Sequence, residues 1–317
     1  MSVIEVEAPG LQTTVQDLGR EGFGPSGVSP SGAADPISLR IGNRLVENAE
    51  NAAGLEMTLV GGTFRFGEEA IVALTGSDFG AELDGVALKP WTSVQVQARQ
   101  TLRFGATRGG ARSYLCVRGG VDIPLFLGSA STHVLSGLGG LEGRALKKGD
   151  VLRVASNRGT SQLGRSVNAN VIESMHSRKV LRVTVGPQSD WYPETSRQAF
   201  YAGTYRVTEE ANRMGLRLEG PPVMPDRERK MITEGVPLGA IQIPPNGQPI
   251  ILFVEQQTTG GYPKIANVIS ADLHRLGQLR PRDEIQFELI GLHAAISLLR
   301  AQEDLMGSAE IFRHAID

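Results

Sequence analysis

Residues 249–264 have the sequence Pro-Ile-Ile-Leu-Phe-Val-Glu-Gln-Gln-Thr-Thr-Gly-Gly-Tyr-Pro-Lys, a short apolar run followed by a polar segment with two glycines. The run 249–254 predicts a buried strand, because it is rich in β-branched and aromatic residues and too short for a helix. Beyond it, five apolar residues have the spacing of one helix face: Ile265, Val268, Ile269, Leu273 and Leu276. The sequence therefore predicts a strand that passes into a helix through residues 257–264.

This connecting segment combines hydroxyls, an aromatic ring and a cation around the glycine pair. Adjacent glycines allow positive φ and a close approach to a ligand, and free amides at the start of a helix favour an anion. We expect a ligand-binding loop made of Gln257, Thr258, Thr259, Gly260, Gly261, Tyr262 and Lys264. The alternative is a tight turn with a capping threonine and no ligand. Such a turn does not require Tyr262 or Lys264, so these two residues favour the binding loop.

Short apolar runs between frequent glycines and prolines predict a mostly β protein with few helices. The expected strands are 70–75, 93–96, 114–117, 151–154, 180–185, 250–254 and 285–289. Besides the helix after Lys264, we expect one at 35–46, capped by Asp35 with Pro36 in its first turn, and a last one at 293–314, interrupted near Gly307.

The two halves of the chain have a similar spacing of predicted strands and glycine pairs. A strand ending in Gly119-Gly120 is followed about thirty residues later by the strand 151–154, and the Gly260-Gly261 pair is followed in the same way by 282–287. The sequence therefore predicts two similar β-barrel domains, at 1–160 and at 175–317, the second with a C-terminal helix. The polar residues 155–177 are expected to link them.

Composition restricts the class of protein. The chain has 317 residues, 40% of them hydrophobic, and a net charge of -2 with basic and acidic residues interleaved. This balance predicts a soluble globular protein that acts on a small molecule, and it favours neither nucleic acid nor a membrane surface. The single cysteine, Cys116, forms no internal disulfide, and the N-terminus lacks a signal-peptide pattern, so we expect a cytoplasmic protein.

Familiar catalytic motifs are missing from the sequence. It contains no Gly-x-Ser-x-Gly, His-Glu-x-x-His or Walker A pattern, and its five histidines are far apart, so we expect no metal site. The match of 22–27 to Gly-x-Gly-x-x-Gly lies outside a βαβ unit and is interpreted as accidental. The only lysine next to a methionine is Lys230, in a charged run, so this chain is not expected to carry biotin.

Two polar clusters near the N-terminus are candidates for the site. Asp17 and Arg20 are interleaved with apolar residues; they can pair structurally, or present a carboxylate and a guanidinium to a substrate carboxylate or phosphate. Ser31 and Asp35 lead into the helix that carries Asn43, and helix capping is as good an explanation for them as function.

Two further clusters lie later in the chain. Ser129 and Ser131 belong to a glycine-rich, hydroxyl-rich loop that would cover a site, or would be a plain loop. Arg213 and Arg217 lie on one side of a hairpin-like stretch, and exposed charge is the favoured explanation for them.

Taken together, these motifs resemble the biotin-dependent carboxyltransferase-like family, which includes the second allophanate hydrolase-type subunit and is chiefly identified with the C subunit of 5-oxoprolinase. The resemblance covers nearly the whole chain. It is carried by residues 10–20, 31–35, 55–58, 75–76, 114–120, 127–132, 234–242 and 257–264. Two departures are Glu255-Gln256, where the family pattern has Ala or Asp followed by Arg or His, and Gly42, where it has Ala.

The resemblance implies two cyclophilin-like β barrels and an ATP-hydrolysing enzyme complex with 5-oxoprolinase subunits B and A. The implied reaction opens the lactam of 5-oxo-L-proline to L-glutamate, with ATP and its magnesium counter-ion. Such chemistry needs cations for phosphate oxygens and donors for developing oxyanion charge. Lys264 and Arg20 are the expected catalytic cations, and Asp17 is expected to orient a cation or a metal-bound phosphate.

Two other functions fit the same resemblance. One is the carboxyltransferase part of a biotin-dependent urea carboxylase, in which a partner brings carboxybiotin. The other is a regulatory binding protein that antagonises an inhibitor of a kinase, which needs an interface and no turnover.

Overall fold

The computed structural model describes residues 2–155, 164–175, 179–227 and 231–313. The chain forms two compact units. Unit 1 comprises Met1–Arg20, Ser31–Met175 and Ser308–Asp317, and unit 2 comprises Glu21–Pro30 and His176–Gly307. None of the helices described is long and apolar enough to cross a membrane.

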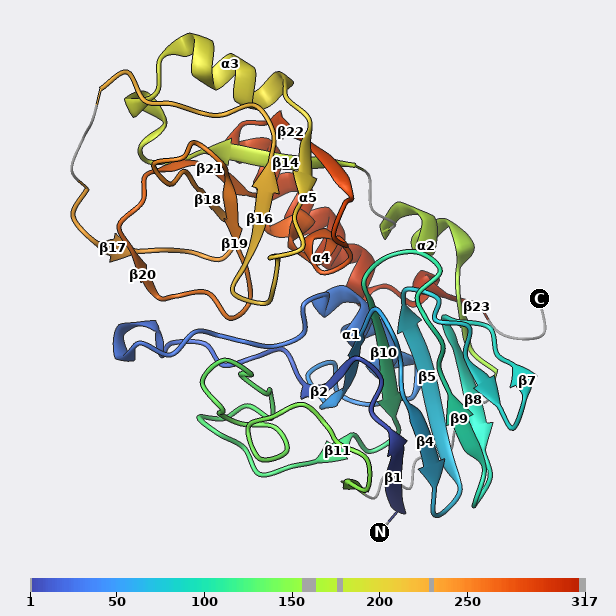
Figure 1. The fold of residues 1–317 in the computed structure, drawn as a ribbon. Coiled ribbons are helices and arrows are strands. Elements are labelled where there is room, and N and C mark those ends of the chain that lie inside the picture. Colours follow the sequence, from blue (N-terminus) through green and yellow to red (C-terminus); the bar gives the residue numbers. More distant parts are fainter. Residues whose placement is uncertain (1, 156–163, 176–178, 228–230, 314–317) are drawn as a thin grey trace. The chain divides into compact units, whose positions relative to one another are not determined.

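Unit 1 consists of two seven-stranded sheets (Figure 1). The first has the order β11-β12-β1-β4-β9-β6-β7, with β1 Ser2–Ala8, β4 Thr63–Phe66, β6 Glu82–Leu83, β7 Val86–Ala87, β9 Thr101–Arg103, β11 Val121–Asp122 and β12 Val151–Val154. The second has the order β2-β3-β10-β5-β8-β13-β23, with β2 Gln12–Gln16, β3 Gly54–Thr58, β5 Ala70–Gly76, β8 Thr92–Val96, β10 Arg112–Val117, β13 Ser166–Val167 and β23 Phe312–Arg313.

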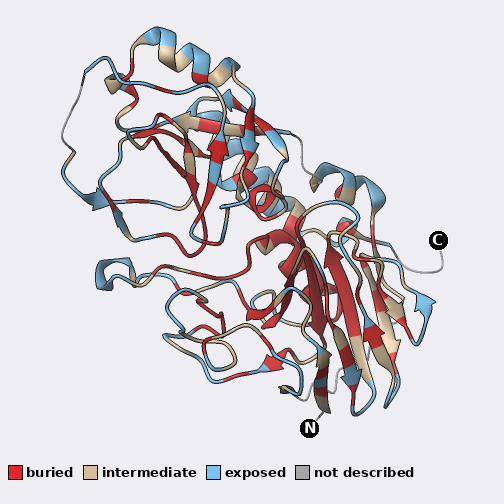
Figure 2. Cartoon of the chain, in the orientation of Figure 1, coloured by how far each residue is buried: buried red, intermediate tan, exposed pale blue. Residues whose placement is uncertain are grey.

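The middle of the second sheet is buried on both faces. All six residues of β10 are buried, as Figure 2 shows, because one face contributes to the core that includes Leu55, Leu74 and Leu115, and α1 (Pro36–Leu45) packs on β5 and β10. The Asp35 carboxylate accepts a hydrogen bond from the Ser38 amide at 3.0 Å, which confirms the expected helix cap. Helix α2 (Ala169–Met175) also belongs to unit 1.

Unit 2 contains a closed seven-stranded barrel with the order β14-β21-β18-β19-β16-β15-β22. Its strands are β14 Val180–Val185, β15 Tyr205–Val207, β16 Gly215–Glu219, β18 Ala240–Gln242, β19 Ile250–Leu252, β21 Lys264–Val268 and β22 Glu284–Leu289. Helix α3 (Glu194–Ala202) packs on β22, where the Phe200 and Phe287 rings stack with centroids 4.7 Å apart. A separate ribbon pairs β17 (Glu234–Gly235) with β20 (Thr259–Gly260). Short 3-10 turns cover Gly24–Ser26 (η1) and Ser189–Trp191 (η2).

The prediction of a mostly β protein with a cyclophilin-like barrel is confirmed. The expected helix directly after Lys264 is wrong, because Lys264–Val268 is the barrel strand β21. Its β-branched residues Ile265 and Val268 are buried as a strand, and helical structure begins only at η3 (Ser270–Asp272) and α4 (Leu273–Leu276).

The last helix is confirmed as α5 (Leu292–Gly307). The interruption expected near Gly307 is the end of the helix, and the expected continuation beyond it is wrong. The chain then continues through η4 (Ala309–Ile311) into β23, which pairs with β13 of unit 1; His314 lies outside the described residues. In the stretch expected to link two domains, the described part contains β13 and α2, whereas 156–163 and 176–178 lie outside the description.

Candidate functional site

The predicted site residues fall into two groups. Asp17, Arg20, Ser31, Asp35, Asn43, Ser129 and Ser131 belong to unit 1, and residues 257–264 belong to unit 2. In unit 1 the structure brings Asp17, Arg20, Ser129 and Ser131 together.

The Asp17 carboxylate holds the loop that carries the two serines. Its Oδ1 accepts hydrogen bonds from the Gly19 amide (2.8 Å) and from the hydroxyls of Ser129 (2.6 Å) and Ser131 (2.5 Å). Its Oδ2 accepts a hydrogen bond from the Ala130 amide at 2.6 Å. Four donors converge on one buried carboxylate, so Asp17 is a strong anchor for the loop.

Arg20 secures the same loop from its backbone side. Its guanidinium donates from Nη2 to the Ser131 carbonyl and from Nε to the Phe126 carbonyl at 3.3 Å. The guanidinium carbon also lies 5.6 Å from the centroid of the Phe126 ring, within cation–π range. Asp17 and Arg20 therefore fix the position of the serine loop.

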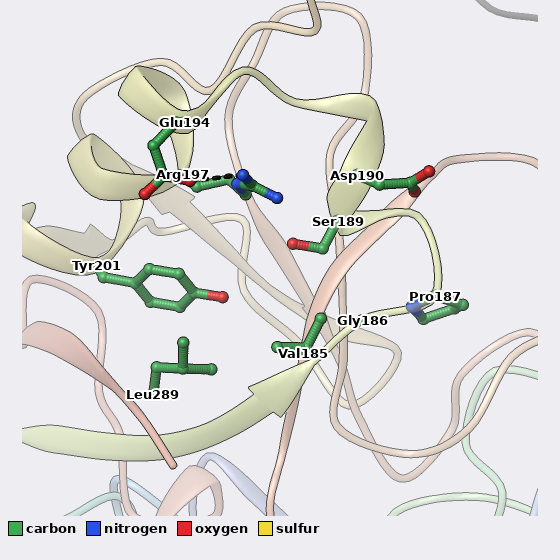
Figure 3. A pocket seen from close by; sticks show the side chains of 9 residues that line it. All are labelled: Val185, Gly186, Pro187, Ser189, Asp190, Glu194, Arg197, Tyr201 and Leu289. Carbon is green, nitrogen blue, oxygen red and sulfur yellow. Dashed lines mark hydrogen bonds and ion pairs between the residues drawn. The ribbon is translucent and has the colours of Figure 1, made fainter. Parts of the chain in front are cut away.

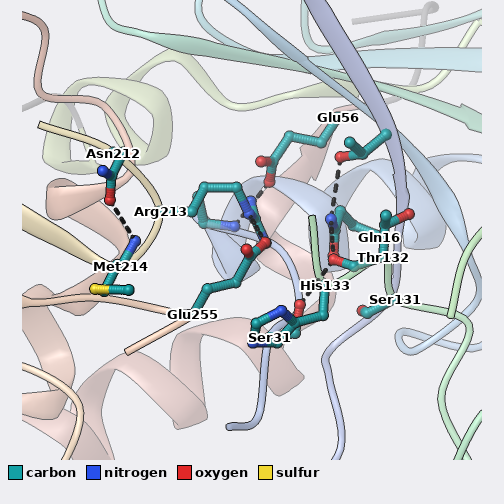
Figure 4. A network of polar contacts seen from close by, with 12 residues as sticks. Gln16, Ser31, Glu56, Ser131, Thr132, His133, Asn212, Arg213, Met214 and Glu255 are labelled. Carbon is teal, nitrogen blue, oxygen red and sulfur yellow. Dashed lines mark hydrogen bonds and ion pairs between the residues drawn. The ribbon is translucent and has the colours of Figure 1, made fainter. Parts of the chain in front are cut away.

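Ser31 and Gln16 meet at the next residue of that loop. The Ser31 hydroxyl donates to the Thr132 carbonyl at 2.8 Å, and Gln16 Nε2 donates to the same carbonyl at 3.0 Å (Figure 4). Ser31 has a φ of 57° and Gly32 one of 90°. Position 32 requires glycine, because its φ is positive and a Cβ there would lie 2.9 Å from the backbone of Leu18 and Gly19.

Asp35 and Asn43 have structural partners. Asp35 caps α1, and Asn43 Nδ2 donates to the carbonyls of Glu50 (3.1 Å) and Ala52 (2.7 Å), which ties down the loop after the helix. Asn43 therefore lies in a different hydrogen-bond network from the Asp17 group.

Glu56 is a buried acid whose role the sequence did not predict. Its Oε2 accepts hydrogen bonds from the Ala34 amide (2.8 Å) and the Tyr114 hydroxyl (2.7 Å), and its Oε1 lies 3.4 Å from Nε of Arg112. Burial, followed by the negative charge of Glu56, raises the pKa of Tyr114. A glutamate within the apolar strand β3 is the sequence signal for this position.

In unit 2, Lys264 begins β21 and is buried. Its ammonium group forms an ion pair with Glu234 on β17, whose side chain is 44% exposed. Gln188 joins the two residues, because its Oε1 accepts from the Lys264 amide (3.0 Å) and its Nε2 donates to Glu234 (3.0 Å). Hydrogen bonds from Lys264 and then from Gln188 lower the pKa of Glu234, which keeps its carboxylate charged.

The loop expected to bind a ligand is a β ribbon. Thr259 and Gly260 pair with Gly235 and Glu234, and the Val236 amide donates to the Thr258 carbonyl at 3.1 Å. No helix starts at this loop, so the expected anion site from helix amides is not formed. Thr259, Gly261 and Tyr262 are exposed beside the buried Lys264.

Two glutamines near this ribbon were not among the expected site residues. Gln242, on β18, pairs with Lys264 on the neighbouring strand β21, and Gln256 precedes the loop. Both are buried, and in the described part of the chain neither Gln242 Nε2 nor Gln256 Oε1 has a hydrogen-bond partner. The sequence signal was a glutamine inside or next to an apolar strand.

Arg213 corrects the expectation of exposed charge. It is buried and forms an ion pair with the buried carboxylate of Glu255, and the Glu255 amide donates to the Arg213 carbonyl at 2.8 Å (Figure 4). The unusual Glu255 thus has a buried cationic partner. Arg217 fits the expectation, since it is half-exposed and lies 3.5 Å from Glu210.

Unit 2 also has an open pocket of about 540 Å³ (Figure 3). Its walls include Val185, Ser189, Tyr201 and Leu289, and at its rim Arg197 Nη2 lies 2.5 Å from Glu194 Oε2.

Among residues that the structure describes, no cluster of three or more His, Cys, Asp or Glu side chains is suited to a metal ion.

The arrangement is that of a β-barrel protein with a buried lysine beside a glycine-containing ribbon, and comparison with known proteins assigns it to a family. The chain belongs to the family described as "Carboxyltransferase domain, subdomain A and B", which it matches over residues 26–289.

Relatives of two kinds share this domain. The chain is 38% identical to the C subunit of 5-oxoprolinase from Escherichia coli over 302 residues, covering 95% of each chain. It is 35% identical to urea amidolyase of Saccharomyces cerevisiae, covering 95% of this chain and 17% of that protein. The solved structure of Kluyveromyces lactis urea carboxylase superposes with a TM-score of 0.91 at 32% identity, covering 96% of this chain and 29% of that one. The chain thus spans less than a third of that solved protein.

Proposed function

We propose that this chain is the C subunit of a cytoplasmic, ATP-dependent 5-oxoprolinase complex, which opens 5-oxo-L-proline to L-glutamate together with the A and B subunits. The observation that carries the proposal is the match to the C subunit of the Escherichia coli 5-oxoprolinase, which is 38% identical over 302 residues and is covered by this chain over 95% of its length. The identity to the yeast urea amidolyase is lower, at 35%.

The chemistry explains why a buried cation is useful. A lactam is a poor electrophile, so transfer of phosphate to its oxygen makes its carbon open to attack by water, and ATP drives the ring opening. A preorganised cation stabilises the negative charge that develops on the oxygens. Lys264 is our candidate for this role, since Gln188 fixes its backbone and it lies beside the exposed Thr259 and Tyr262.

Asp17 and Arg20 have a different role in this proposal. Their hydrogen bonds hold the buried hydroxyl of Ser129 and the hydroxyl and carbonyl of Ser131 in place, so they position the serine loop. Because the described residues offer no carboxylate cluster for magnesium, ATP phosphates and a partner chain would hold that ion. This chain would carry no biotin.

A second candidate is the carboxyltransferase part of a urea carboxylase-type enzyme. It is favoured by the TM-score of 0.91 to the urea carboxylase of Kluyveromyces lactis. A biotin-carrying partner is required for this function, and capture of such a partner on avidin would reveal it.

The deciding experiment measures phosphate release from ATP by this chain mixed with candidate A and B subunits, with and without 5-oxoproline. Release that requires 5-oxoproline and all three proteins supports the proposal. A stable complex without such release, together with carboxyl transfer to urea, would replace it by the second candidate.

A further inference from the structure

Two buried glutamines beside Lys264 have polar atoms that nothing in the described chain uses. Gln242 is 2% exposed and Gln256 is 6% exposed, and Nε2 of the first and Oε1 of the second have no hydrogen-bond partner among the residues described. An unsatisfied buried polar group costs about 1–3 kcal/mol. Such groups next to a candidate site indicate atoms that a ligand satisfies.

The orientation of Gln256 is determined by its other end. Its Nε2 donates to the Val236 carbonyl at 3.1 Å, so the unpaired atom is the oxygen, an acceptor. Val236 itself is bonded to the ribbon through the Thr258 carbonyl. The acceptor is therefore attached to the segment that carries the binding loop.

Gln242 approaches the same segment from the barrel. It is the cross-strand partner of Lys264, at a register shift between Ile241 and Gln242. Its Nε2 lies so close to Gly260 that a Cβ at that residue would collide with it, and the Val236 side chain lies 3.1 Å from the same point. The Gln242 amide therefore lies against Gly260, the Gln256 amide against Val236, and the Lys264 ammonium against Glu234, the ribbon partner of Gly260.

We propose that Gln242 and Gln256 recognise the amide group of the ligand. Gln242 Nε2 donates a hydrogen bond to its carbonyl oxygen, and Gln256 Oε1 accepts one from its N–H, with the Lys264 ammonium beside the oxygen. The ligand class is a compound with an unsubstituted amide N–H, here a lactam. The choice of a lactam rests on the proposed function; the assignment of the two glutamines does not.

The test uses 5-oxoproline and N-methyl-5-oxoproline as probes, because in the second a methyl group replaces the hydrogen of the N–H. Their affinities are measured by titration calorimetry on the full chain mixed with candidate A and B subunits. The wild type should bind 5-oxoproline about fivefold more tightly or better, as expected for one hydrogen bond of about 1 kcal/mol. Gln256→Met should remove this preference by weakening 5-oxoproline alone.

Gln242→Met should weaken both probes by a similar factor and keep their ratio. Gln286→Met is the matched control, since this glutamine on β22 is exposed and its side chain donates to Thr204 at 3.0 Å. This variant should bind both probes as the wild type does. Thermal unfolding checks that each variant is folded.

Wild-type-like affinities in both Gln242→Met and Gln256→Met would overturn the assignment and leave water as the partner of the two glutamines. No binding of either probe would overturn the choice of a lactam as the ligand. The binding measurements and the phosphate-release assay test different proposals. Lactam-dependent phosphate release with unaffected glutamine variants rejects only the assignment, whereas N–H-selective binding without phosphate release rejects only the proposed function.

Discussion

The Glu234 carboxylate lies against the Lys264 ammonium group, and Gln188 bonds to both residues. The lysine is buried, while the glutamate side chain is half-exposed on a two-residue strand. The cation therefore has an internal counter-ion that can be displaced by an incoming anion. Two predictions separate the roles of the two residues.

Lys264→Ala should lower the turnover of the assembled complex about 100-fold, the usual cost of removing one preorganised group that stabilises developing charge. Turnover is measured as 5-oxoproline-dependent phosphate release. Lys179→Ala, which removes an exposed lysine of the same unit, is the control and should keep normal activity. Unchanged turnover in Lys264→Ala would remove this residue from the mechanism.

Glu234→Gln should instead tighten the binding of an anionic ligand by about two- to fivefold. The expected size corresponds to about 0.4–1 kcal/mol, at the upper end of the range for ion pairs near the surface, because Glu234 is half-exposed although Lys264 is buried. The ligand no longer has to displace this pair. The readout is the KM for 5-oxoproline and for ATP. A higher KM for both would mean that Glu234 orients Lys264 and does not compete with the ligand.

Gly260→Ala should raise the KM for 5-oxoproline by several-fold, because the new methyl group would push the Gln242 carboxamide out of place. The free energy of unfolding should fall by about 1–3 kcal/mol, as is usual for overpacking. Gly291→Ala is the control, since a Cβ there meets nothing within 4 Å. An unchanged KM with reduced stability would show that Gly260 matters only for packing.

Local signals in the sequence predicted much of the fold. The cap at Asp35, the end of α5 at Gly307 and the short apolar strands all depend on neighbouring residues. The segment after Lys264 was assigned wrongly because its apolar spacing fits a helix face, whereas closure of the barrel with β14 and β18 requires a strand.

Features that depend on distant partners could not be predicted. Arg213 is buried because Glu255, 42 residues away, neutralises it. Likewise, the pairing of β23 with β13 joins residues that are about 146 positions apart, and no local pattern indicates it. The candidate loop was located from its glycines and its lysine, but Glu234, Gln188 and the two buried glutamines became visible only in three dimensions.

The buried carboxylate of Asp272 should make the stability of unit 2 sensitive to acid. Burial raises the pKa of its carboxyl group, but hydrogen bonds from Arg182 (2.9 Å from the amide, 3.0 Å from Nε) and the charge of Arg275 outweigh burial, so the pKa is lowered. A lowered folded-state pKa stabilises the protein above the unfolded-state value of about 3.9, and this contribution is lost as the pH falls through the folded value.

Asp272→Asn should therefore cost roughly 3 kcal/mol in urea unfolding at pH 7, the usual penalty for breaking a buried ion pair, and much less at pH 3. Asp190→Asn, at an exposed carboxylate, is the control and should have little effect at either pH. An equal loss at both pH values would assign the effect to packing and not to charge.

Gly42 and Cys116 are predicted to be energetically coupled. In α1, a Cβ at Gly42 would lie 2.6 Å from the Cys116 sulfur and 2.9 Å from the Thr75 hydroxyl, so the buried thiol fills the space of an alanine methyl group. Burial raises the pKa of this thiol, which keeps it protonated and unreactive. Gly42→Ala should thus destabilise the protein by about 1–3 kcal/mol, although alanine favours helices by about 1 kcal/mol over glycine.

A double-mutant cycle measures the coupling in urea unfolding. In a Cys116→Ala background the sulfur is gone, so Gly42→Ala should cost at least about 1 kcal/mol less than in the wild type. Cys116→Ser is the matched control, because it keeps an atom at the sulfur position and should preserve most of the cost. Additive effects of Gly42→Ala and Cys116→Ala would mean that the helix shifts away from β10 to accommodate the methyl group, and that the thiol does not determine why glycine is needed at position 42.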